Sequence, residues 1–113
     1  MTPGQQDLDN AYSILLGDLN QAYWAADSMD VKDQLYGIIE IVTSLITQLV
    51  ATDLETRNAA YDALLARVGT VNKELKTLQE QINSLINRIS TAAAIVSDIA
   101  KVLSVAATVF PAA

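Results

Sequence analysis

The residues best suited to chemistry in this sequence are three aspartates in the segment DSMDVKD. Asp27, Asp30 and Asp33 are spaced three residues apart. An EF-hand calcium loop uses a different spacing, with a turn glycine and a terminal glutamate that this segment lacks. On a helix, the three carboxylates would lie along one side close to the N-terminus, where negative charge is favourable. We interpret them as a solvated helix face and expect no metal site.

Several residue types that catalysis commonly needs are missing. The chain has no histidine and no cysteine, which excludes Ser–His–Asp and Cys–His arrangements, histidine-based zinc sites and the di-iron motif of ferritin-like bundles. The four glycines are isolated along the chain and form no phosphate-binding loop: Gly4, Gly17, Gly37 and Gly69. We therefore expect no catalytic residues, no cofactor and no enzymatic activity.

The aromatic residues offer one further candidate for a binding site. Trp24 lies near Tyr12, Tyr23 and Tyr36 in the sequence. These side chains are expected to form a small patch near the junction of the first two helices. Aromatic side chains bury large apolar areas, so packing is favoured over a ligand site.

Composition limits the fold and the partners. The chain has 113 residues, 51% of them hydrophobic and 18% charged, with only four glycines and two prolines, which suits long helices rather than turns. A net charge of −6 excludes nucleic acid as an expected partner. The polar start MTPGQQDLDN does not resemble a secretory signal. The expected location is the cytoplasm, or outside the cell by export without a cleavable signal.

The first half of the chain is expected to form two helices after a disordered segment over residues 1–7. Apolar residues recur every three or four positions over 8–26 and again, in a different phase, over 29–51, as in amphipathic helices. Asp27 and Ser28 are suitable N-caps for the second helix. Because neither glycine nor proline separates the two ranges, one bent helix with a stutter is an alternative.

The second half is expected to form one very long helix over residues 54–110. Thr52 and Glu55 have the spacing of a capping box, and Pro111 marks the end. Gly69 is expected to be tolerated inside the helix, with a new start at Thr70 as the alternative. Beyond Arg57, apolar side chains alternate by three and four as in a left-handed coiled coil, and they are Tyr61, Leu64, Val68, Val71, Leu75, Leu78, Ile82, Leu85, Ile89, Ala92, Val96, Ile99, Leu103, Ala106 and Phe110.

The predicted fold is all-α, either a long antiparallel hairpin or a three-helix bundle with coiled-coil-like packing. Residues 1–53 carry eight acids and one base, a net charge of −7, and residues 54–113 carry five acids and six bases, a net charge of +1. An antiparallel arrangement would bring the two halves together, for example Asp33 beside Lys73. Residues 38–50 are apolar around much of the helix, which calls for neighbours on more than one side.

The predicted function is that of a non-enzymatic helical assembly protein. It would associate with itself through the apolar seam, a dimer being favoured, or with another protein. The residues expected to make this contact are Leu78, Ile82, Leu85, Ile89, Val96, Ile99, Leu103 and Phe110. A second alternative is a small regulatory protein or inhibitor that binds a partner's hydrophobic groove.

The other alternative is a membrane-interacting or pore-forming-type protein that uses the apolar segment 91–110. This segment has the length to cross a bilayer. However, Asp98 and Lys101 lie near its middle, and each charge there costs roughly 2.5–3.5 kcal/mol on insertion scales. A permanent transmembrane helix is therefore not expected. In this alternative the protein is soluble at first and exposes the segment to a bilayer after a rearrangement.

Overall fold

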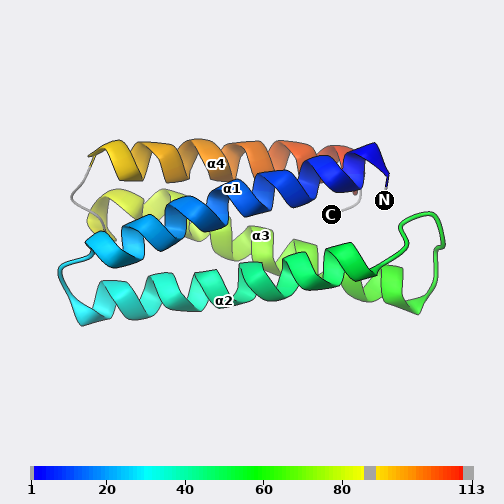
Figure 1. The fold of residues 1–113 in the computed structure, drawn as a ribbon, viewed down its shortest axis with the longest axis horizontal. Coiled ribbons are helices and arrows are strands. Elements are labelled where there is room, and N and C mark those ends of the chain that lie inside the picture. The colour runs from blue at the N-terminus through cyan, green and yellow to red at the C-terminus, as the bar shows by residue number, and fades with distance from the viewer. Residues whose placement is uncertain (1, 86–88, 111–113) are drawn as a thin grey trace.

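The computed structural model describes residues 2–85 and 89–110, without the side chains of residues 83, 85, 89 and 90. The described residues form four helices: α1 (Pro3–Ala25), α2 (Met29–Ala51), α3 (Ala59–Leu85) and α4 (Ile89–Val109). Successive helices run in opposite directions (Figure 1). The all-α fold predicted from composition and periodicity is confirmed.

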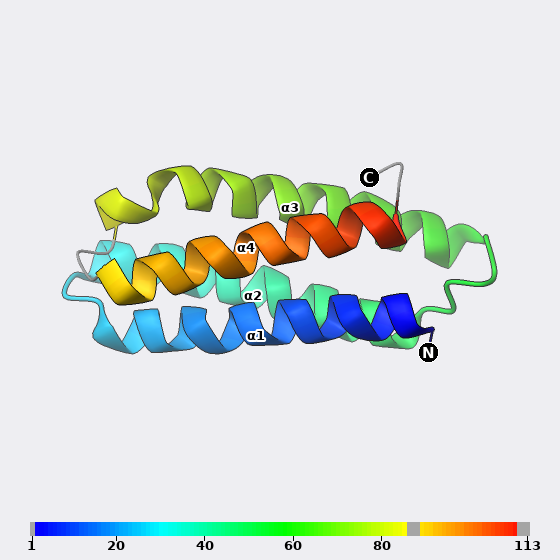
Figure 2. The ribbon, with the colours of Figure 1, turned by 90° about the horizontal axis from the view of Figure 1, so that it is seen from above.

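The helices form a slender bundle in which each lies beside two others. α1 packs against α2 and α4, and α3 packs against the same two helices from the opposite side (Figures 1 and 2). The Cα atoms extend over 44 × 21 × 20 Å. The turn between α1 and α2 lies at one end, and the loop between α2 and α3 lies at the other, near the start of α1 and the end of α4.

The prediction of a single helix over residues 54–110 is wrong. The range contains α3 and α4, which lie side by side. Gln79 Nε2 on α3 donates a hydrogen bond of 3.2 Å to the carbonyl oxygen of Val96 on α4, and the rings of Tyr61 and Phe110 approach to 5.8 Å between centroids. Two short helices bury their apolar stripes within one chain, whereas one helix of about 85 Å would leave half of its stripe uncovered.

The start of α3 also differs from the prediction, because Thr52 completes α2 instead of capping the next helix. Its hydroxyl donates to the Gln48 carbonyl at 2.7 Å, so it is not free to cap a helix at residue 54. α3 begins at Ala59, and the Asn58 side chain accepts from the amide of Tyr61 at 3.1 Å. By contrast, Ser28 caps α2 as predicted, and α3 continues through Gly69.

The N-terminal segment is helical from Pro3 rather than disordered to residue 7. Thr2 is the N-cap of α1 and accepts from the Gln5 amide. The buried Gln5 side chain donates to the carbonyl oxygens of Leu49 at 2.7 Å and Thr52 at 2.9 Å. Helix C-termini leave carbonyls without partners, so Gln5 both satisfies the end of α2 and joins α1 to it.

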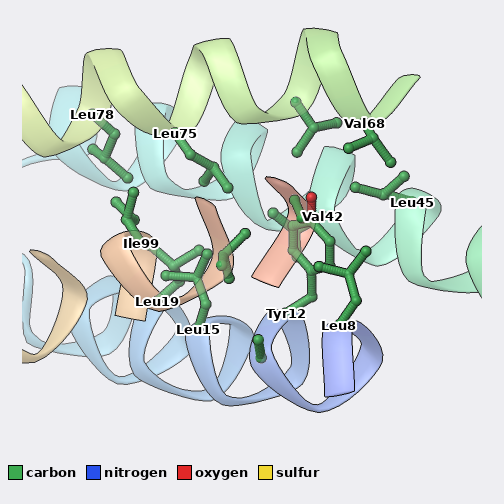
Figure 3. Close-up of a cluster of buried hydrophobic side chains, with 14 of the residues drawn as sticks. Leu8, Tyr12, Leu15, Leu19, Val42, Leu45, Val68, Leu75, Leu78 and Ile99 are labelled. Atoms are coloured by element: carbon green, nitrogen blue, oxygen red, sulfur yellow. The ribbon is translucent and has the colours of Figure 1, made fainter. Parts of the chain in front are cut away.

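All four helices contribute to one hydrophobic core (Figure 3). Tyr12 is fully buried, and its hydroxyl reaches from α1 to α3, where it donates to Asn72 Oδ1 at 2.6 Å. Burial raises the pKa of Tyr12 well above its ordinary value, against the smaller opposing effect of the hydrogen bond to Asn72. The phenol therefore remains a neutral donor inside the bundle.

Candidate functional site

A groove runs between α2 and α3, and we call it the α2–α3 groove. α1 packs closely on α2 and α4, while α3 packs more loosely on the same neighbours. The resulting groove has a volume of about 760 Å³. Its lining consists of Asp33, Gln34, Gly37, Ile38, Ile41, Ala63, Ala66, Arg67, Thr70, Val71, Glu74, Thr77, Leu78 and Gln81.

Small side chains on both walls produce the groove. Gly37 on α2 faces open space, since a Cβ atom there would meet nothing within 4 Å. Ala63 and Ala66 form part of the α3 wall. The apolar floor comes from Ile38 and Ile41, which are only partly buried, so the groove leaves hydrophobic surface in contact with water.

Charged side chains of both signs line the α2–α3 groove. Asp33 lies toward the end near the α1–α2 turn, because it is close to the start of α2. Arg67 lies seven residues before Glu74 on α3, and its Nη1 donates to Ser44 Oγ at 2.9 Å. Seven residues on a helix correspond to about 10 Å on one face, so Arg67 and Glu74 occupy separate positions along the groove.

A smaller groove of about 400 Å³ lies between α3 and α4. Lys73 and Lys76 line it together with Gly69, Asn72 and Leu103. Asp33, which was expected to lie beside Lys73, instead lines the α2–α3 groove. The expected pairing of these two side chains is wrong because Lys73 is turned toward α4.

The seam residues predicted to contact a partner make contacts within the chain. Leu78, Ile82, Ile99 and Phe110 are buried in the core. Val96 and Leu103 are half-buried and pack against it. The side chains of Leu85 and Ile89 lie outside the described part of the chain. Folding back at the end of α3 therefore occupies much of the seam internally.

The α2–α3 groove was not identified from the sequence as a contact surface. One signal for it existed, namely the apolar width of residues 38–50, which indicated more than one neighbour for this helix. The positions of Ala63, Ala66 and Arg67 on the other wall depend on the rotation of α3 in the bundle. Their sequence pattern does not determine that rotation.

An exposed aromatic cluster occupies the α1–α2 end of the bundle. The rings of Tyr23 and Trp24 lie 5.3 Å apart between centroids in an edge-on arrangement, and Tyr23 and Tyr36 lie 6.3 Å apart. Lys32 Nζ lies 5.3 Å from the Tyr23 centroid and 5.9 Å from that of Trp24. Trp24 is 76% exposed and Met29 is 70% exposed. The expected aromatic patch is thus present without Tyr12, but the expectation that its side chains are buried or half-buried is wrong for Trp24 and Tyr36, which are exposed.

A pair of carboxyl groups lies between α1 and α4. Asp98 and Asp18 are both half-buried, and Asp98 Oδ2 is buried without a hydrogen-bond partner among the described residues. Burial first, and then the neighbouring Asp18 carboxylate, raise the pKa of Asp98 to about 7. A negative charge beside a partly buried carboxyl group opposes its ionisation, so Asp98 takes up a proton more readily than an exposed aspartate.

Two other properties of the described residues bear on function. No group of three or more acidic side chains that could hold a metal ion is found in residues 2–85 and 89–110. Two helical segments, Met29–Ala51 and Thr91–Val109, are long and apolar enough to cross a membrane by length and composition. Comparison with protein-family models, curated protein sequences and solved structures gave no match.

Proposed function

We propose that this protein is a non-enzymatic helical interaction protein that associates with itself through the α2–α3 groove. The observation that carries the proposal is the apolar groove itself, about 760 Å³ in volume and open to water. Protein–protein contacts are favoured by burying such surfaces. A second copy of the chain supplies the same kind of surface.

The arrangement of α2 supports this proposal. Its inner stripe of Leu35, Val42, Leu45 and Leu49 is buried in the core. Further apolar side chains lie within or beside that stripe and remain partly or largely accessible, and they are Ile38, Ile39, Ile41, Ile46 and Val50. A helix with a wide apolar surface is stabilised by neighbours on more than one side, and α3 covers Ile38 and Ile41 in the groove only in part.

The mass of the protein in solution tests self-association. Size-exclusion chromatography with light scattering over a range of concentrations should show a species of twice the chain mass of 12.1 kDa, with the dimer fraction rising with concentration. A mass of one chain throughout would contradict the proposal. In that case the groove would remain available to a helix of a different protein, as in the inhibitor alternative.

A second candidate function is contact with a membrane. Two observations favour it: the two helical segments with sufficient length and apolarity, and the exposed Trp24, Met29 and Tyr36 at one end of the bundle. Tryptophan and tyrosine are favoured at membrane interfaces. On this proposal the aromatic end touches the bilayer first, and α4 separates from α1 to bring Val96 and Leu103 into contact with lipid.

Dye release from phosphatidylcholine vesicles tests this second candidate. The wild-type protein should release the dye, and a variant with Trp24→Ala and Tyr36→Ala should release it more slowly. Ile14→Ala is a suitable control because Ile14 is also exposed, at 61%, but belongs to the middle of α1. If the wild-type protein neither binds the vesicles nor releases the dye, the result contradicts membrane contact.

A further inference from the structure

We infer that the α2–α3 groove is occupied by the same groove of a second copy, the two copies being related by a twofold axis that crosses the groove between Arg67 and Glu74. This inference rests on the proposed self-association and adds the partner, its orientation and the residues in contact. It follows from the charges that line the groove, the small residues in its walls and its apolar floor.

The charges are arranged for a twofold partner. Arg67 and Glu74 both line the groove from α3, and they lie about 10 Å apart along the helix. A rotation of 180° about an axis that runs across the groove between these two residues places Arg67 of each copy opposite Glu74 of the other. The same favourable contact then forms twice, as an isologous interface requires. A partner in the parallel orientation would not bring Arg67 opposite Glu74.

The middle of the groove has room for close approach. Gly37 presents no side chain, and a Cβ atom built there would meet nothing within 4 Å. Ala66 and Thr70 belong to the α3 wall of the same groove. Backbones of neighbouring helices approach most closely where residues are small, so α2 of one copy can lie against the groove of the other at this point.

The floor supplies apolar area around the axis. Ile38 and Ile41 are partly buried in the single chain and lose their remaining contact with water when the grooves face each other. One long face of the bundle extends over 44 Å by about 20 Å between Cα atoms, and a standard interface buries ~800 Å² on each partner. A stable dimer of standard size therefore uses most of this face, with the groove near its middle.

Two glycine substitutions test whether the groove is the interface. Gly37→Lys puts a long charged side chain into the groove, whereas Gly17→Lys adds the same side chain to α1, where a Cβ atom also meets nothing within 4 Å. Both replace a helical glycine and change the charge equally. We expect Gly37→Lys to be monomeric at concentrations where wild type and Gly17→Lys are dimeric, by light scattering, with equal helical circular dichroism.

Charge reversals test the orientation. Arg67→Glu places acids opposite acids twice in the symmetric dimer, and Glu74→Arg places an arginine opposite an arginine twice. Each variant alone should weaken dimerisation about tenfold or more. An equimolar mixture should form a mixed dimer with nearly wild-type affinity. In that dimer the introduced glutamate of one chain meets the introduced arginine of the other, and the unchanged Glu74 and Arg67 meet at the second contact.

The outcomes separate this inference from the proposed function. A wild-type protein that remains monomeric overturns both. A dimer that persists in Gly37→Lys overturns the groove as the interface while self-association stands. A third outcome is that Gly37→Lys loses the dimer but the mixture of Arg67→Glu and Glu74→Arg does not recover it. That outcome overturns only the twofold orientation.

Discussion

Asp98 is a residue through which pH acts on the bundle, and the carboxyl group of Asp18 lies beside it. They lie on α1 and α4, which pack closely, and the pKa of Asp98 is raised to about 7 by burial and by Asp18. A carboxyl whose pKa is higher in the folded chain than in the unfolded one stabilises the fold when protonated. This contribution is fully present below the ordinary value of 3.8 and is lost as the pH rises through about 7.

Asp98→Asn should therefore stabilise the bundle above pH 7, because the amide resembles the protonated acid and donates to Asp18. Water around the half-exposed pair screens the repulsion, so we expect a gain of about 1 kcal/mol in the free energy of unfolding. The gain should shrink as the pH falls toward 4. Urea denaturation at pH 5 and pH 8 measures it.

Asp27→Asn is the matched control, since Asp27 is exposed between α1 and α2. It removes the same charge without touching the pair. An equal gain in both variants would show that net charge, rather than the pair of carboxyl groups, is responsible.

Gln5 is a second single residue that stabilises the fold, because its side chain donates hydrogen bonds to two backbone carbonyls. Gln5→Leu leaves the oxygens of Leu49 and Thr52 without the side-chain amide that bonds to them, and an unsatisfied buried polar group costs ~1–3 kcal/mol. We expect a loss of about 2 kcal/mol in the free energy of unfolding. Gln6→Leu, an exposed neighbour on the same helix, should cost less than half as much. Equal losses would mean that the two hydrogen bonds are unimportant in solution.

At the scale of elements, the antiparallel placement of α3 and α4 makes Phe110 a core residue. It is 1% exposed, and its ring packs against Tyr61 near the start of α3. Phe110→Ala should lower the free energy of unfolding by about 3 kcal/mol, as expected for truncating a buried phenylalanine. Thr108→Ala, on the exposed side of α4, is the control and should change it by less than about 0.5 kcal/mol. A negligible cost for Phe110→Ala would place this residue outside the core and contradict the packing of α4 on α3.

Local signals in the sequence predicted the helices of the first half well. Ser28 caps α2 by accepting a hydrogen bond from the nearby Val31 amide, and α2 spans the expected residues 29–51. The end of α1 at Ala25 is within one residue of the expected end at 26. The N-terminal start was missed because it depends on Gln5 bonding to carbonyls that are 44 and 47 residues away in the sequence.

The separation of α3 from α4 was missed for a different reason. Leu78, Ile82, Leu85 and Ile89 continue the three-and-four alternation, and neither glycine nor proline interrupts residues 83–91. Periodicity reports which face is apolar, but it does not report whether another chain or the same chain covers that face. In α4 the buried positions include Ile95 and Val102, one residue from the predicted Val96 and Leu103, because this helix faces α1 as well as α3.

At the scale of the whole molecule, the start of α1 and the end of α4 close the bundle. A Cβ atom built on Gly4 lies 3.3 Å from Val109 Cγ2, which places the two Cβ atoms within ~5 Å of each other, near the ~3.5–4.5 Å that a disulfide spans. The chain contains no cysteine, so a variant with Gly4→Cys and Val109→Cys has only one possible intramolecular disulfide. That bond joins the two helices that would separate on contact with a membrane.

Oxidation of the Gly4→Cys, Val109→Cys variant should raise the free energy of unfolding by about 4 kcal/mol relative to the reduced form, because the bond closes a loop of roughly 100 residues. Guanidinium denaturation of the oxidised and reduced forms measures this difference, and Gly4→Ser with Val109→Ser controls for the substitutions themselves. Failure of the disulfide to form would contradict the neighbouring positions of the two helix ends.

The oxidised and reduced samples also test the membrane candidate, because a bundle that must open to reach lipid should release vesicle dye when reduced and retain it when oxidised. Equal release by both forms would mean that α1 and α4 stay together during any membrane contact, leaving the exposed Trp24 end as the part of the molecule that touches the bilayer.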